Sequence, residues 1–189
     1  EKVSYDGGPL KRRDKIVLFA GRVTLQKGPD YFIDAAKIIL DHNPNVTFIM
    51  AGTGDMLARM IDKAARLGIS HKFIFHGFYN REEAEKFYSM ADVFIMPSVS
   101  EPFGVVPFEA QVKGTPAIIS KQSGVSEVMR HCLKVDFWDV NDIAAKTLAL
   151  LYYPTLNSTM GQNGYYEAKT SNWEKPAQLC IDLYKEMVS

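Results

Sequence analysis

Short apolar runs alternate with helix-patterned segments along most of the chain, and this alternation constrains the fold more than any other feature. The runs have the length and unbroken hydrophobicity of strands that are buried on both faces of a sheet. They are IVLFA at 16–20, VTFIMA at 46–51, KFIFH at 72–76, ADVFIM at 91–96, PAIIS at 116–120 and LKVDF at 133–137. Because helices that link parallel strands form right-handed β-α-β units, the pattern predicts an α/β fold. We expect a Rossmann-like, doubly wound parallel sheet of about six strands with helices on both faces.

The segments between and after these runs have apolar residues at helical spacing. Asn80 and Glu83 have the spacing of a capping box at the start of the third helix, and Pro154 is interpreted as a break between helices. The expected helices lie around 32–40 and at 56–67, 81–90, 105–112, 125–129, 139–151, 160–170 and 173–187.

The length of 189 residues suits one domain with its own core. With 22 basic and 22 acidic residues the formal net charge is zero, so no overall field attracts nucleic acid.

No apolar run approaches the roughly 20 residues that cross a bilayer. Cys132 and Cys180 lack metal-ligand spacing and are interpreted as small buried thiols, which fits a reducing compartment. We therefore expect a cytoplasmic domain with no transmembrane segment and no nucleic-acid partner.

We expect this domain to occupy residues 15–189. Residues 1–14 are polar and contain two glycines and a proline, and the chain begins at Glu1 rather than at a methionine. This composition is typical of a linker or arm. We expect it to come from a missing N-terminal domain.

The turn after the first predicted strand carries two cations beyond the strand's carboxyl end, where open α/β sheets bind ligands. Gly21 permits the turn, and Arg22 and Lys27 follow it. Arginine binds phosphate oxygens in a bidentate manner and lysine acts as a point charge, so the pair suits a diphosphate and can neutralise it as it leaves. On this segment alone, two ordinary surface cations are an equally good interpretation.

The next two turns are rich in glycine. Gly52 and Gly54 lie in AGTGD, and Gly77 follows FIFH. Two glycines without a third, and without a ribose-binding acid at the expected distance, do not make a dinucleotide fingerprint. These glycines let a ligand approach the backbone, or they are simply turn glycines.

The fourth turn lies in PSVSEPFGVVPFEA at 97–110 and places Glu101 and Glu109 on either side of Gly104. Gly104 precedes a helix whose first N–H groups are unpaired and suited to a phosphate. The carboxylates then accept hydrogen bonds from sugar hydroxyls. Alternatively, Glu101 favours the helix dipole and Glu109 is a solvated helix residue. The chain shows no metal-ligand spacing, which favours hydroxyls over a cation as the ligand.

Several motifs occur in an order that resembles a known family. They are GRVTLQKG, AGTGD, FHGF, ADVFIMPSVSEPFGVVPFEA, GTPAIIS, SGVSE and NWEKPA. Together they resemble the C-terminal, donor-nucleotide-binding half of the family 4 retaining glycosyltransferases, a glycogen synthase-like group with the GT-B fold. One departure is SGVSE at 123–127, which has a single glycine where the family often has two.

The resemblance implies specific roles for the turn residues. Arg22 and Lys27 hold the donor diphosphate and Glu101 contacts the donor sugar; these three are the expected catalytic residues. Glu109 binds the ribose, and Phe78 lies against the base. The expected donor-binding residues are Gly21, Gly52, Gly54, Gly77, Phe78, Phe103, Gly104, Val105, Val106 and Glu109.

The resemblance also implies an activity. Such an enzyme moves a hexosyl unit from a UDP-, ADP- or GDP-sugar to an acceptor with retention of configuration, and needs no metal or other cofactor. The acceptor-binding N-terminal domain is expected to be missing, so the chain alone should bind donor without transferring sugar. Two alternatives stay open: a non-catalytic interaction or regulatory module on the same fold, and a GT-B-fold sugar-nucleotide epimerase.

Overall fold

The protein is described from a computed structural model covering residues 14–171 and 174–188. Nearly all of the expected linker at 1–14, and the Asn172-Trp173 pair of the NWEKPA motif, lie outside the described residues. Asp14, the last residue of the expected linker, accepts a hydrogen bond from the Thr47 hydroxyl over 3.2 Å.

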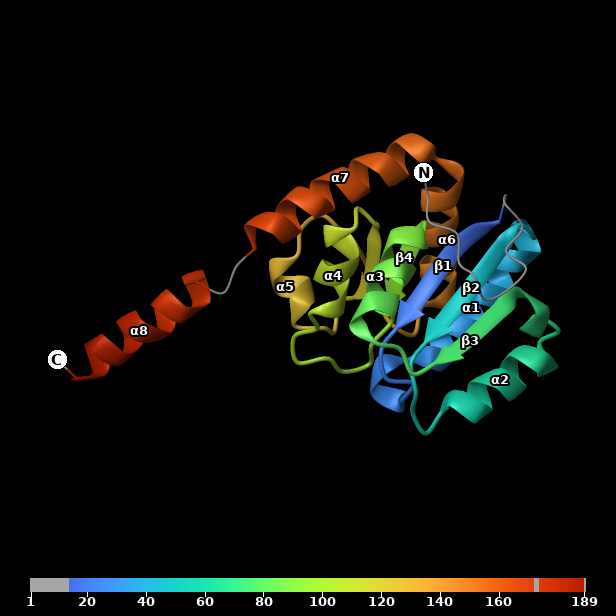
Figure 1. Cartoon of the computed structure of the whole chain (residues 1–189), viewed down its shortest axis with the longest axis horizontal. Coiled ribbons are helices and arrows are strands. Elements are labelled where there is room, and N and C mark those ends of the chain that lie inside the picture. The colour runs from blue at the N-terminus through green and yellow to red at the C-terminus, as the bar shows by residue number, and fades with distance from the viewer. Residues whose placement is uncertain (1–13, 172–173, 189) are drawn as a thin grey trace.

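Six parallel strands form one sheet, which confirms the predicted fold class (Figure 1). They are β1 (Lys15–Ala20), β2 (Val46–Ala51), β3 (Phe73–Gly77), β4 (Val93–Met96), β5 (Ala117–Ser120) and β6 (Leu133–Val135). Their order in the sheet is β3-β2-β1-β4-β5-β6. The chain builds outward from β1 to β3 and then resumes on the other side of β1 with β4. The carboxyl ends of β1 and β4 therefore form the switch point at which such sheets bind ligands.

Hydrophobic cores cover both faces of the sheet, because alternate residues of a strand point to opposite faces. In β1, Val17 and Phe19 belong to one core, and Leu18 and Ala20 belong to the other. The first core is covered by α1 (Pro29–His42), α2 (Leu57–Arg66) and α6 (Val140–Tyr152). The second is covered by α3 (Arg81–Met90), α4 (Val106–Val112) and α5 (Val125–Val128).

Most predicted elements have the expected bounds within a residue or two. The capping box of α3 is confirmed: Asn80 Oδ1 accepts from Glu83 N over 3.0 Å, and Glu83 Oε2 accepts from Asn80 N over 2.8 Å. Two short 3-10 helices, η1 (Leu25–Lys27) and η2 (Ser70–Lys72), were not predicted. The last strand ends at Val135, two residues earlier than expected.

Pro154 separates two helices as predicted, because α6 ends at Tyr152 and α7 (Pro154–Thr170) begins at Pro154. The expected start of this helix at 160 was wrong: proline suits the first helical position, which needs no N–H donor. This helix packs across α4 and α6 (Figure 1). Cys132 is buried as expected, whereas Cys180 is exposed on α8 (Glu174–Val188).

Over residues 14–171 and 174–188, no helix is long and apolar enough to cross a membrane.

Candidate functional site

Backbone hydrogen bonds and close packing join the loop after β1 to the loop after β4 at the switch point. The backbone carbonyl of Gln26, in η1, accepts hydrogen bonds from Val99 N over 2.9 Å and Ser100 N over 3.3 Å. Gly28 follows η1 with φ +63°, and a Cβ there would lie 2.1 Å from Pro97 O. Only glycine fits a backbone that approaches so closely with a left-handed conformation. The Gln26 carbonyl and the glycine at position 28 therefore set how closely the two loops approach each other.

The contact between the two loops brings Lys27 and Glu101 together. Lys27 is the last residue of η1, and its Nζ forms an ion pair with Glu101 Oε2. The two side chains are only 16% and 13% exposed. Burial, and after it the positive charge of Arg22, lower the pKa of Lys27; the Glu101 carboxylate acts in the opposite direction by favouring the charged form. Two of the three expected catalytic residues thus meet in a largely desolvated pair.

Arg22, the third expected catalytic residue, is exposed. Its positive charge contributes, after burial, to the lowered pKa of Lys27, so Arg22 lies near the pair. No carboxylate of the described residues pairs with the Arg22 guanidinium. The switch point therefore presents one exposed cation beside one buried cation.

The loop after β5 holds the backbone of Glu101 and its neighbours by hydrogen bonds. Gly124 N donates to Glu101 O over 2.9 Å, and Val125 N donates to Phe103 O over 2.8 Å. A Cβ on Gly124 would lie 2.0 Å from Pro102 O, so the one glycine of SGVSE is required for this contact. Its role in the structure is backbone packing beneath Glu101.

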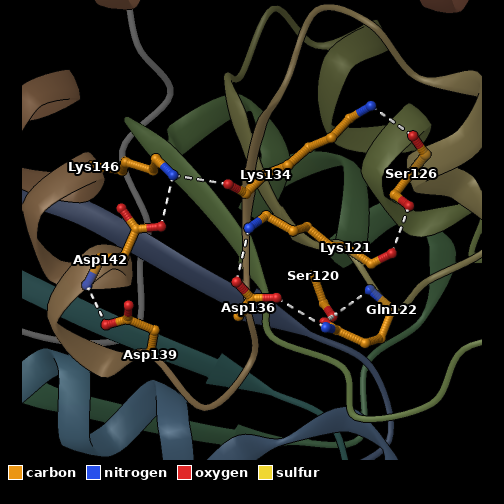
Figure 2. A network of polar contacts seen from close by, with 9 residues as sticks. All are labelled: Ser120, Lys121, Gln122, Ser126, Lys134, Asp136, Asp139, Asp142 and Lys146. Atoms are coloured by element: carbon orange, nitrogen blue, oxygen red, sulfur yellow. Dashed lines mark hydrogen bonds and ion pairs between the residues drawn. The ribbon is translucent and has the colours of Figure 1, made fainter.

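A polar network in turn fixes the loop after β5 (Figure 2). Asp136, just after β6, accepts from Lys121 Nζ over 2.7 Å and from Gln122 Nε2 over 3.0 Å. The Ser120 hydroxyl donates to Gln122 Oε1 over 2.8 Å, and Ser126 Oγ donates to Lys121 O over 2.8 Å. Sequence reasoning missed this network, although its polar residues follow strands whose carboxyl ends share one edge.

Glu109 lies apart from the ion pair, in the first turn of α4. The hydroxyl of Tyr88, on α3, donates to Glu109 Oε2 over 3.0 Å. Both residues line a cavity of about 680 Å³ between α3 and α4. The lining residues are Tyr79, Asn80, Arg81, Ala84, Glu85, Tyr88, Glu109, Val112 and Lys113. The two carboxylates of the 97–110 stretch thus face different places: Glu101 faces η1, and Glu109 faces this cavity.

The remaining expected donor-binding residues surround the carboxyl edge of the sheet. Gly52 packs against the backbone of Gly21, where a Cβ on Gly52 would lie 1.7 Å from Gly21 O, and Gly54 packs in the same way against Val23. Gly77 O accepts from Gly52 N over 2.8 Å. These contacts give the glycines a role in packing the turns together, and their roles toward a donor stay predictions.

The expected apolar contacts divide into exposed and packed side chains. Phe78 is 77% exposed and Val105 is 49% exposed. Phe103 stacks on Phe108 with ring centroids 6.4 Å apart. Gly104 has φ +90° and lies against the Glu101 side chain, and Val106 begins α4. Phe78 is thus the large apolar side chain most open to a ligand at this edge.

Among the described residues, no group of three or more His, Cys, Asp or Glu side chains could hold a metal ion.

The strand order and the charged switch point define a class of protein: a Rossmann-like α/β domain of the kind that forms the C-terminal half of GT-B glycosyltransferases. The family model "Glycosyl transferases group 1" matches residues 6–167. The chain therefore belongs to the group 1 glycosyltransferases.

Individual relatives agree with this assignment. An uncharacterized glycosyltransferase of Methanocaldococcus jannaschii is 43% identical over 118 residues, which are 62% of this chain and 30% of the relative. The C-terminal domain of a group 1 glycosyltransferase from Francisella tularensis has 24% identity and a TM-score of 0.74, with 84% of this chain and 85% of that chain covered. Anabaena HepE, solved with UDP and glucose, has 21% identity and a TM-score of 0.81, with 92% and 49% covered.

The chain spans between 30% and 44% of the length of the curated relatives that it matches. It thus corresponds to one half-sized part of such an enzyme.

Proposed function

We propose that this domain binds the nucleoside diphosphate sugar donor of a retaining hexosyltransferase. The observation that carries the proposal is the largely buried Lys27–Glu101 pair at the β1–β4 switch point, with the exposed Arg22 beside it. A ligand suited to this place carries negative charge for the cations and hydroxyls for the carboxylate. A sugar diphosphate combines both groups.

The diphosphate lies against Arg22 and Lys27 in this proposal. Arginine offers a planar, bidentate donor set to phosphate oxygens, and the partly buried lysine acts in surroundings where water screens charge weakly. Without ligand, Glu101 neutralises Lys27. When the diphosphate takes over Lys27, oxygens of Glu101 become available to accept hydrogen bonds from the sugar hydroxyls.

The nucleoside enters the cavity between α3 and α4. Its volume of about 680 Å³ is in the range usual for small-molecule pockets. Glu109 offers a carboxylate to the ribose hydroxyls, and the exposed Phe78 ring lies at the same edge of the sheet for contact with the base. The likeness to HepE, whose structure holds UDP and glucose, supports a nucleotide and a sugar as ligands of this fold.

Transfer proceeds without a metal in this proposal, because two fixed cations neutralise the charge that grows on the departing diphosphate. The acceptor is bound by the remainder of the full-length enzyme, since the chain spans less than half of its curated relatives. The isolated domain therefore binds donor but does not transfer sugar.

Isothermal titration with UDP, ADP, GDP and their hexose conjugates tests this function. At least one conjugate should bind, and Arg22→Ala should weaken it by about tenfold or more, as expected for the loss of a charge-assisted phosphate contact. Arg130→Ala is the matched control, because Arg130 is exposed and precedes β6 at the opposite edge of the sheet. Absence of binding by every nucleotide, or equal affinity of the Arg22 variant and the wild type, would contradict the proposal.

A further inference from the structure

Tyr88 connects the hydrophobic core to the rim of the α3–α4 cavity. Tyr88 is only 2% exposed, yet its hydroxyl donates a hydrogen bond to Glu109 Oε2 over 3.0 Å. Glu109 itself is an exposed residue of a short helix. A buried ring thus holds an exposed carboxylate.

The position of Tyr88 is fixed at two further points. Its ring lies edge-on to Phe94 of β4, with centroids 6.1 Å apart at 81°. Its backbone carbonyl accepts a hydrogen bond from Thr115 Oγ1 over 2.5 Å. A rotation of the ring would break the packing against β4, so the hydroxyl stays where it meets Glu109.

The hydroxyl of Tyr88 has one hydrogen, and Glu109 accepts it. Burial, and after it the charge of Glu109, raise the pKa of Tyr88, so the hydroxyl stays protonated and donates. Tyr79 also lines the cavity.

One oxygen of Glu109 is occupied and the other is not. Oε2 accepts from Tyr88, whereas Oε1 has no hydrogen-bond partner among the described residues. An unanchored glutamate on a helix surface samples several rotamers and must lose that freedom when it binds a ligand. A carboxylate that is already oriented binds without this loss.

We propose that Tyr88 is a positioning residue for Glu109: it anchors Oε2 and thereby holds Oε1 ready for the ribose hydroxyls of the donor. The inference rests on the proposed function, because it takes the ribose as the ligand of Glu109. It adds a residue from α3 that does not itself touch the donor sugar or the phosphates.

The test compares ribose recognition in wild type, Tyr88→Phe, Glu109→Ala and the double variant. Each is titrated with UDP, ADP and GDP, and then with the 2′,3′-dideoxy analogue of the diphosphate that the wild type binds most tightly. The readout is the ratio of the two affinities. Loss of folded protein changes both affinities together, so a merely structural effect leaves this ratio unchanged.

The wild type should prefer the ribose form by about tenfold or more, as expected when a charged acceptor loses its donors. Tyr88→Phe should lower this preference severalfold, Glu109→Ala should abolish it, and Tyr88→Phe should change nothing further in the Glu109→Ala background. Tyr152→Phe is the matched control, because it also removes one tyrosine hydrogen bond, 2.8 Å to His42 O, on another part of the surface.

Two results would overturn the inference, and they differ. If the wild type discriminates against the dideoxy analogue and Tyr88→Phe discriminates equally, Tyr88 does not position Glu109. If the wild type binds no nucleoside diphosphate at all, the proposed function itself is wrong, and the role of Tyr88 toward ribose is wrong with it.

Discussion

Lys27 and Glu101 lie 74 residues apart in the sequence, and their side chains form an ion pair across the β1–β4 switch point. Backbone hydrogen bonds hold both loops in place. Gln26 O, next to Lys27, accepts from Val99 N and Ser100 N, and Gly124 N donates to Glu101 O. The pair is thus placed by the loops and is not a chance contact of two surface side chains. The charges of Lys27 and Glu101 balance each other before any ligand arrives, and Arg22 adds a positive charge beside them.

Removing one member of the pair leaves the other largely buried without a partner. Lys27→Met keeps the length of the side chain and removes its charge, and we expect a loss of unfolding free energy of about 1–3 kcal/mol, less than for a fully buried pair because both side chains keep some exposure. Urea unfolding measures this loss. Glu101→Gln added to Lys27→Met should restore part of it; an unchanged urea midpoint in the single variant would show that the pair contributes nothing.

Glu101 should distinguish the sugar from the diphosphate. In Glu101→Gln the cations remain, so the affinity for a nucleoside diphosphate should be equal to or higher than that of the wild type, whereas the affinity for the matching nucleotide sugar should fall by about tenfold. Titration calorimetry gives both values. Glu127→Gln, on the exposed side of α5, is the control. Equal weakening of both ligands by Glu101→Gln would remove Glu101 from sugar recognition.

Asp136 should make stability depend on pH in the acid range. Hydrogen bonds from Lys121, and then from Gln122, lower the pKa of Asp136 below its ordinary value of 3.8. A depressed pKa contributes stability above the ordinary value, and the contribution is lost as pH falls toward the folded-state pKa. The stability difference between wild type and Asp136→Asn should therefore be largest near neutral pH and shrink below about pH 4. Thermal unfolding at several pH values measures it, and a difference that is constant or grows toward acid would contradict this assignment.

Donor binding should not require a divalent cation, because Arg22 and Lys27 supply the positive charge in the proposed function. Titrations in EDTA and in millimolar Mg²⁺ should give the same affinity for the nucleotide sugar. Binding that appears only with Mg²⁺ would mean that a metal carries the diphosphate.

Local patterns in the sequence predict the fold well for physical reasons. A strand buried on both faces must be apolar throughout, as in VTFIMA at 46–51, and a helix start needs caps, as at Asn80 and Glu83. The predicted break at Pro154 is confirmed, but the helix after it begins at Pro154 itself and not at 160, because proline is also suited to the first position of a helix. A proline thus marks where one helix ends, and its neighbours decide where the next one begins.

The site was only partly predictable, because its parts come from distant segments. The motifs identified Lys27, Glu101 and Glu109, yet no local signal shows that Glu101 pairs with Lys27 while Glu109 faces another cavity. Tyr88 lies in a helix among core residues, so the sequence does not show that its hydroxyl meets a carboxylate 21 residues later. These relationships depend on strand order and loop geometry.

A crystal structure of the domain with the nucleotide sugar that it binds most tightly would show directly which residues hold the donor. We expect the diphosphate in contact with Arg22 and Lys27, the sugar hydroxyls on Glu101, and the ribose on Glu109 at the α3–α4 cavity. A nucleotide sugar whose phosphates contact neither Arg22 nor Lys27 would contradict this expectation.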